Sequence, residues 1–248
     1  SEDIGGYNSP ENYQVIPEVM WAPASGGGEW KTEIFITDVT GGSEVFITYD
    51  TFTGTRRGPI SLGTFASQFK SGSVPNILAV LNYLDSGFDY YGTAGTLEFT
   101  TQDENHKIQT IARTYNGNYS KTFQGISFNN ANTASTERSL MVQNLVSNDT
   151  FRSAFGAFNA AAESAEVRFT ILDENCSLIG ASFTKTFAGY QFHAFNPFAE
   201  AGVPYPSYQY DAAWVKVEVI SGSGQIMAFG STSNNFTNDP AVHRGVLR

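Results

Sequence analysis

The chain has 248 residues, of which 41% are hydrophobic, 14% aromatic and only 15% charged, and its formal net charge is −10. Phosphates of nucleic acids and anionic membranes repel so acidic a chain, which has no basic run, and this excludes nucleic acid as an expected partner. No apolar stretch approaches the roughly 18 residues of a membrane span, and the 24 glycines and many aromatic residues favour strands joined by tight turns.

The chain opens with a polar segment, residues 1–14, whose few apolar side chains predict an extended segment outside the core. Because the first residue is not Met, we expect an exported protein, secreted or at the cell surface, whose signal peptide has been removed. Residues 29–38 and 44–50 then alternate apolar and polar side chains with a period of two. This period predicts half-buried antiparallel strands, with Trp30 facing the core.

One helix is predicted in the first half of the chain, over residues 73–84. Ser73 is the expected N-cap, Pro75 lies in the first turn, and an apolar stripe runs from Ile77 to Leu84. Residues 96–116 follow as a strand, a polar turn and a second strand, which predicts a hairpin.

The second half of the chain repeats the first. Residues 150–173 align with 29–50, residues 179–189 with 62–72, and residues 214–234 with 96–116, in the same order and at offsets of 117 to 121 residues. Trp30 aligns with Phe151, and Asn116 aligns with Asn234. Three blocks at nearly one offset indicate an internal duplication. Asn196, Pro197 and Gly202 mark a second short helix at the matching place.

These patterns predict an all-β chain of two tandem, internally duplicated antiparallel β-sandwich domains, Ig-like or jelly-roll-like, each with one short helix. The predicted boundaries are an N-terminal segment at 1–14, a first sandwich at 15–128, a linker at 129–136 and a second sandwich at 137–248. Phe151 and Trp214 are expected in the second core. The single cysteine, Cys176, allows no intrachain disulfide and is expected to be a small buried side chain, with an intermolecular thiol as the alternative.

At this point the sequence resembles a family of secreted, uncharacterised bacterial tandem β-sandwich proteins. The likeness lies in an Ile-Pro pair at 16–17, a Gly-rich loop and an aromatic-basic-Thr strand at 30–32, the second repeat at 151–184, and a closing Asn-x-Thr-x-Asp-Pro segment within 224–245. It covers most of residues 15–245. The resemblance implies an exported β-sandwich protein, and it implies no catalytic residues.

The titratable residues predict no catalytic set. The three histidines have no metal-ligand spacing, and no nucleophile elbow occurs. The stretch YLDSGFDYYG at 83–92 places Asp85 and Asp89 among tyrosines, which fits a loose calcium loop, a sugar platform or an ordinary exposed turn. Asp239, in the polar segment near the C-terminus, is a third calcium candidate. Otherwise we expect no cofactor.

We therefore expect a non-enzymatic extracellular structural or adhesive protein, self-assembling through its N-terminal segment by strand addition. The alternative is a carbohydrate-binding module, because exposed aromatic rings can stack on sugars. A glycoside hydrolase or other hydrolase is a third candidate. The expected partners are thus a second copy or a surface glycan. The candidate ligand-binding aromatics are Trp21, Tyr90, Tyr91, Tyr205, Tyr208 and Tyr210.

Overall fold

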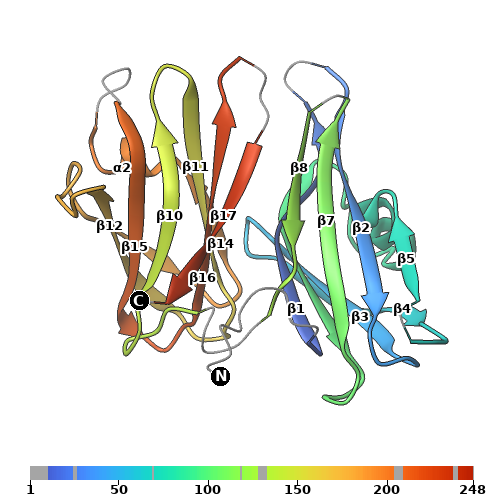
Figure 1. Ribbon diagram of the computed structural model, residues 1–248. Coiled ribbons are helices and arrows are strands. Elements are labelled where there is room, and N and C mark those ends of the chain that lie inside the picture. Colours follow the sequence, from blue (N-terminus) through green and yellow to red (C-terminus); the bar gives the residue numbers. More distant parts are fainter. Residues whose placement is uncertain are drawn as a thin grey trace. The chain divides into compact units, whose positions relative to one another are not determined.

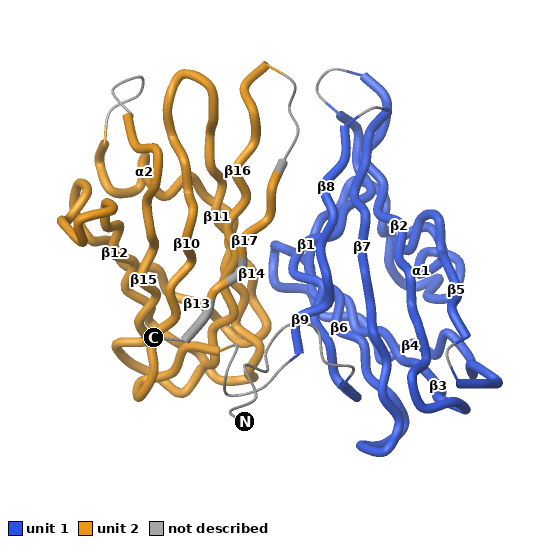
Figure 2. The backbone as a smooth tube through the Cα atoms, in the orientation of Figure 1, with its two compact units in different colours: residues 1–128 blue, residues 129–248 orange. Residues whose placement is uncertain are grey.

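The computed structural model describes residues 11–24, 27–68, 70–117, 119–127, 133–203, 209–236 and 240–247. The chain divides into two compact units, Ser1–Phe128 and Asn129–Arg248 (Figure 2). Among the described residues, neither helix has the length and apolar character required to span a bilayer.

The first unit is an antiparallel sandwich formed by one sheet that continues from one layer into the other (Figure 1). One layer has the order β4-β3-β6-β1, and the other has the order β2-β7-β8, with β5 beside β2 and the short β9 beside β1. The end of β1 pairs with the start of β2 and joins the layers. The elements are β1 (Tyr13–Pro23), β2 (Glu29–Asp38), β3 (Glu44–Thr51), β4 (Arg56–Thr64), β5 (Ser71–Val74), α1 (Ile77–Leu84), β6 (Thr93–Thr101), β7 (Ile108–Asn116), β8 (Tyr119–Gln124) and β9 (Ile126–Ser127).

The second unit is an antiparallel sandwich of eight strands in the order β13-β12-β15-β10-β17-β16-β11-β14. The strand β17 passes between the layers, because its first residues pair with β16 and its last with β10. The elements are β10 (Leu140–Ser147), β11 (Phe151–Asn159), β12 (Ala165–Asp173), β13 (Phe183–Phe187), β14 (Phe192–Phe195), α2 (Pro197–Glu200), β15 (Tyr210–Gly222), β16 (Ile226–Asn234) and β17 (Pro240–Leu247). The predicted all-β sandwich class is confirmed.

The two units pair their strands in the same order, as a duplication requires. The pairs β1–β6, β2–β5, β2–β7, β3–β4, β3–β6 and β7–β8 recur as β10–β15, β11–β14, β11–β16, β12–β13, β12–β15 and β16–β17. The register also agrees. Thr32 faces Thr114 in the first unit, and Ser153 faces Thr232 at the matching level of the second.

A buried hydroxyl pair fixes the bulged first strand of the first unit. The register of β1 shifts between Ile16 and Val19, so the strand cannot pair continuously there. Beyond the bulge, the Met20 N–H donates to Thr32 Oγ1 at 2.9 Å, and this hydroxyl lies 2.8 Å from Thr114 Oγ1. Both threonines are fully buried. They connect β1 to the layer formed by β2 and β7.

The second unit repeats this connection with a serine. The register of β10 shifts between Val142 and Leu145, and the next amide, that of Val146, donates to Ser153 Oγ at 2.9 Å. Ser153 Oγ lies 2.9 Å from Thr232 Oγ1, and both side chains are buried. The same two contacts therefore hold the bulged strand in each unit.

Several local predictions are corrected by the structure. Trp30 and Phe151 occupy matching levels but are only partly buried, because each lies at an end of its sandwich. Trp214 alternates with buried Ala213 and Val215 and so lies on the outer side of β15. Cys176 is exposed in a turn and is not a core side chain.

Element boundaries differ from the predictions at three places. Gln14, assigned to the N-terminal segment, is fully buried in β1, where its Oε1 accepts from the Thr110 amide at 2.7 Å. Ala134, assigned to the linker, lies in the core of the second unit. The first helix begins later than expected, because Asn76 and not Ser73 is its N-cap; Asn196 caps the second helix as predicted.

We predict that Thr32→Val destabilises the protein by about 1–3 kcal/mol, because the Met20 amide and the Thr114 hydroxyl lose a buried partner. Urea unfolding measures this change. The matched control is Thr37→Val, which breaks an exposed hydroxyl pair with Ser71 and should cost under about 0.5 kcal/mol. Equal costs for the two variants would contradict the role given to the buried pair.

Candidate functional site

The predicted calcium loop is a turn held by an ion pair. Arg57 donates two hydrogen bonds to the Asp85 carboxylate, from Nε at 2.8 Å and from Nη2 at 2.7 Å. The Tyr90 hydroxyl donates a third to the same carboxylate at 2.9 Å. The hydrogen bonds from Arg57 hold the pKa of Asp85 at about 2. Asp89 accepts the backbone N–H of Tyr91, as turn aspartates commonly do. These contacts of Asp85 and Asp89 are those of an ordinary exposed turn. Calcium binding at residues 83–92 stays a prediction.

The aromatic candidates do not form one platform. Tyr90 is fully buried, with its ring 5.4 Å from that of Tyr49, so its faces are not available to a sugar. Tyr210 belongs to the second unit and stacks on Phe198 at 5.6 Å. Tyr205, Tyr208 and Asp239 lie outside the described residues.

Trp21 and Tyr91 remain together at the surface. Their rings meet edge to face at 5.1 Å, and Tyr91 is 43% exposed. The Trp21 Nε1–H is buried without a hydrogen-bond partner. Among the described members of the predicted aromatic set, this pair lies where a ligand can contact it.

A buried cluster of acids was not predicted from the sequence. Asp50 on β3 and Glu98 on β6 are almost fully buried. Arg56 Nη1 donates to Asp50 Oδ2 at 2.7 Å and to Glu98 Oε1 at 2.5 Å, and the Tyr13 hydroxyl donates to Glu98 Oε2. From the sequence, Asp50 and Glu98 belong to a set of acids that lie mostly at strand ends and turns, where acids are usually solvated. The missing information was that β3 and β6 are neighbours, with Asp50 opposite Thr96 and Glu98 opposite Thr48, which places the two acids diagonally across the strands.

The cluster holds a proton. Burial, followed by the hydrogen bond with Glu98, raises the pKa of Asp50 to about 9, so this carboxyl is protonated at neutral pH. Two carboxylates in contact cannot both be charged. One is therefore neutralised by the proton, and the charge of the other is compensated by Arg56. The cluster joins side chains of β1, β3, β4 and β6. The two carboxyl groups are hydrogen-bonded to each other, whereas a glycosidase pair is separated by about 5–10 Å to admit sugar and water.

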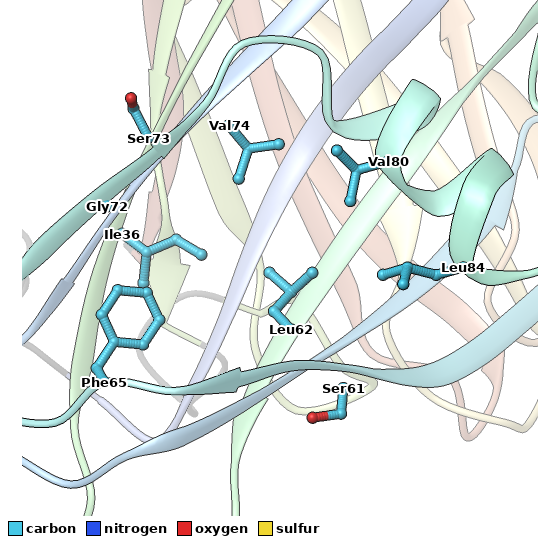
Figure 3. Close-up of a pocket in the computed structure, with 9 residues that line it drawn as sticks. All are labelled: Ile36, Ser61, Leu62, Phe65, Gly72, Ser73, Val74, Val80 and Leu84. Atoms are coloured by element: carbon cyan, nitrogen blue, oxygen red, sulfur yellow. The ribbon is translucent and has the colours of Figure 1, made fainter.

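An apolar pocket of about 330 Å³ opens between the two layers of the first unit. It lies between the edge strands β4 and β5 and is bounded by α1 (Figure 3). Figure 3 shows side chains from all three elements converging on this space. The apolar lining residues are Ile36, Leu62, Phe65, Val74, Val80 and Leu84.

The second unit fills the corresponding space with its own aromatic side chains. Phe195 pairs with Phe155 on the neighbouring strand, as Val74 pairs with Ile34 in the first unit. The Phe195 ring lies 5.6 Å from that of Phe183 and 5.2 Å from that of Phe155. The first unit has valine at this level and so leaves the edge open.

A polar pocket of about 390 Å³ continues along β4. It shares Leu84 with the apolar pocket and is lined by Arg56, Arg57 and Asp85. The combined site thus has an apolar part and a part with both donors and acceptors. The sequence offered one signal for it: extending the repeat alignment to Val74 and Phe195 would have revealed a small side chain where the other copy has a large one.

Comparisons with known proteins give no family. No family model matches the chain, and no curated protein matches it. The apo form of a Pleurotus ostreatus lectin is similar at 9% identity and a TM-score of 0.20, over 100% of this chain and 78% of that one. A Bacteroides uniformis β-glucuronidase is similar at 10% identity and a TM-score of 0.21, over 97% of this chain but 28% of that one. Likeness at this level identifies neither a ligand nor an activity.

We predict that Asp50→Asn removes a pH dependence of stability. The folded pKa of about 9 lies above the ordinary value of about 4, so the native state keeps a proton that the unfolded chain releases. This contribution is complete below about pH 4 and is lost as pH rises to about 9, at up to about 1.4 kcal/mol per pH unit. Urea unfolding at several pH values should show a flatter curve for the variant. Parallel curves for the two proteins would contradict the shared proton.

Proposed function

We propose that this chain is a non-catalytic, exported structural or adhesive protein whose first unit binds an apolar group between its edge strands β4 and β5. The observation that carries the proposal is the open pocket beside Val74, at a position that the second unit closes with Phe195. A fold that can fill this space in one copy leaves it open in the other, which favours a binding role over imperfect packing.

The size and lining of the pocket support an apolar ligand group. About 330 Å³ lies at the small end of ligand sites, and branched aliphatic side chains form most of the wall. Each CH₂ that leaves water for such a wall contributes about 0.8 kcal/mol. The nearby Arg57–Asp85 pair supplies donors and acceptors that can orient a polar group attached to the ligand.

The acid cluster supports a non-catalytic role. Asp50 and Glu98 are almost fully buried and are held by Arg56 and Tyr13. A general acid or nucleophile must reach its substrate, and Asp50 and Glu98 are only 1% and 3% exposed.

We predict that Val74→Phe, which introduces the residue of the second unit, abolishes binding of an apolar fluorescent probe such as anilinonaphthalene sulfonate. The added ring occupies the space between β4 and β5. The reciprocal variant Phe195→Val should open a second site and increase probe binding. Fluorescence titration measures both. Unchanged binding by a folded Val74→Phe protein would refute the proposed site.

A carbohydrate site at Trp21 and Tyr91 is the second candidate. The Tyr91 ring is exposed, and the exposed Asp89 lies two residues away. An exposed aromatic face beside a carboxylate matches the groups that bind sugars in proteins.

We predict that Tyr91→Ala lowers any glycan affinity by about tenfold, because stacking on one ring is lost. A glycan array followed by titration of the strongest ligand measures the effect. Tyr83→Ala is the control, since Tyr83 is 86% exposed and has no ring partner among the described residues. An array without any binding would eliminate this candidate.

A further inference from the structure

The strand β5 offers a free edge beside the apolar pocket. It has four residues and pairs with β2 on one side, and no described strand pairs with its other side. Gly72 and Val74 face the pocket, whereas Ser73 pairs with the exposed Phe35 on the outer face. Because residues opposite each other in a sheet share a face, a strand added beside β5 at the level of Gly72 would direct a side chain into the pocket.

The first ten residues of the chain, SEDIGGYNSP, have the chemistry for this edge. Ile4 is a branched apolar side chain like those that line the pocket. Glu2 and Asp3 precede it. Lys70, two residues before Gly72, is exposed and has no ion-pair partner within the described ranges. If residues 1–10 align in parallel beside β5 with Ile4 opposite Gly72, then Glu2 lies opposite Lys70.

We propose that residues 1–10 of a second copy add to β5 as a strand and insert Ile4 into the pocket. This inference rests on the proposed function, for which it names the ligand. The gain is burial of Ile4 together with backbone hydrogen bonds to the free edge and an ion pair between Glu2 and Lys70.

A second copy is favoured because the chain's own segment starts on the wrong side of the sheet. Glu11 bonds to Ile108 on the side of β7 that faces away from β2. Ile108 pairs with Asp38, whose N–H donates to the Lys70 carbonyl. Glu11 is therefore about three strand spacings, about 14 Å, from the edge at Lys70. The segment of another copy approaches that edge without crossing the sheet.

A mixing experiment with full-length chains tests the proposal. Ile4→Ser breaks the segment but keeps the pocket, and Val74→Phe fills the pocket but keeps the segment. Sedimentation velocity should show concentration-dependent association of the unaltered chain and at least about tenfold weaker association of each variant alone, since one buried branched side chain is lost. An equimolar mixture of the two variants should form a heterodimer, because one intact segment meets one intact pocket.

Charge reversal provides a test that does not depend on packing. Lys70→Glu should weaken association, and the double variant Lys70→Glu with Glu2→Lys should restore it. A chain that stays monomeric at all concentrations, or a folded Val74→Phe variant that associates like the unaltered chain, would overturn the proposal. If, in either of those cases, the unaltered chain binds the fluorescent probe and Val74→Phe does not, the proposed function survives while this inference fails.

Discussion

The fold of each unit depends on how its first strand passes between two layers. A bulge breaks the regular pairing of β1 and of β10, and just beyond it a backbone amide donates to a buried hydroxyl, that of Thr32 or of Ser153. A second hydroxyl on the next strand completes each pair. Buried polar groups are costly without partners, so this contact permits essentially one register for the strand. The edge strands β4 and β5, and the pocket between them, are positioned by that frame.

The same frame carries different chemistry in its two copies. At the level where the first unit has Asp50 and Glu98, the second has Leu172 and Lys216, so the proton-sharing cluster belongs to the first unit alone in the described structure. The two units also differ at Val74 of β5 and the matching Phe195 of β14. Phe195 fills the edge of the second unit, whereas Val74 leaves the edge of the first unit open. Because both units have the same strand pairing, their side chains can be compared position by position. Features shared by both copies support the fold, and features present in one copy are candidates for function.

Much of the fold was predictable because strand periodicity and the repeat are properties of neighbouring residues. Alternation around Ile34 and Val45 marked strands, and the alignment of Trp30 with Phe151 and of Asn116 with Asn234 predicted equivalent positions. The site was not predictable in this way. Periodicity does not reveal that Tyr90 packs on Tyr49 or that Arg57 grips Asp85, because those contacts join residues from different strands and loops. Trp214 was misplaced because alternation defines two faces without saying which one is the core.

The two units differ most in one place: the first holds an open apolar pocket where the second is filled by phenylalanine rings. A crystal equilibrated under xenon pressure tests it most directly, because xenon occupies apolar cavities without forming hydrogen bonds. We expect xenon density beside Val74 and Leu84, between β4 and β5, and none beside Phe183 and Phe195. Xenon at both edges, or at neither, would contradict it.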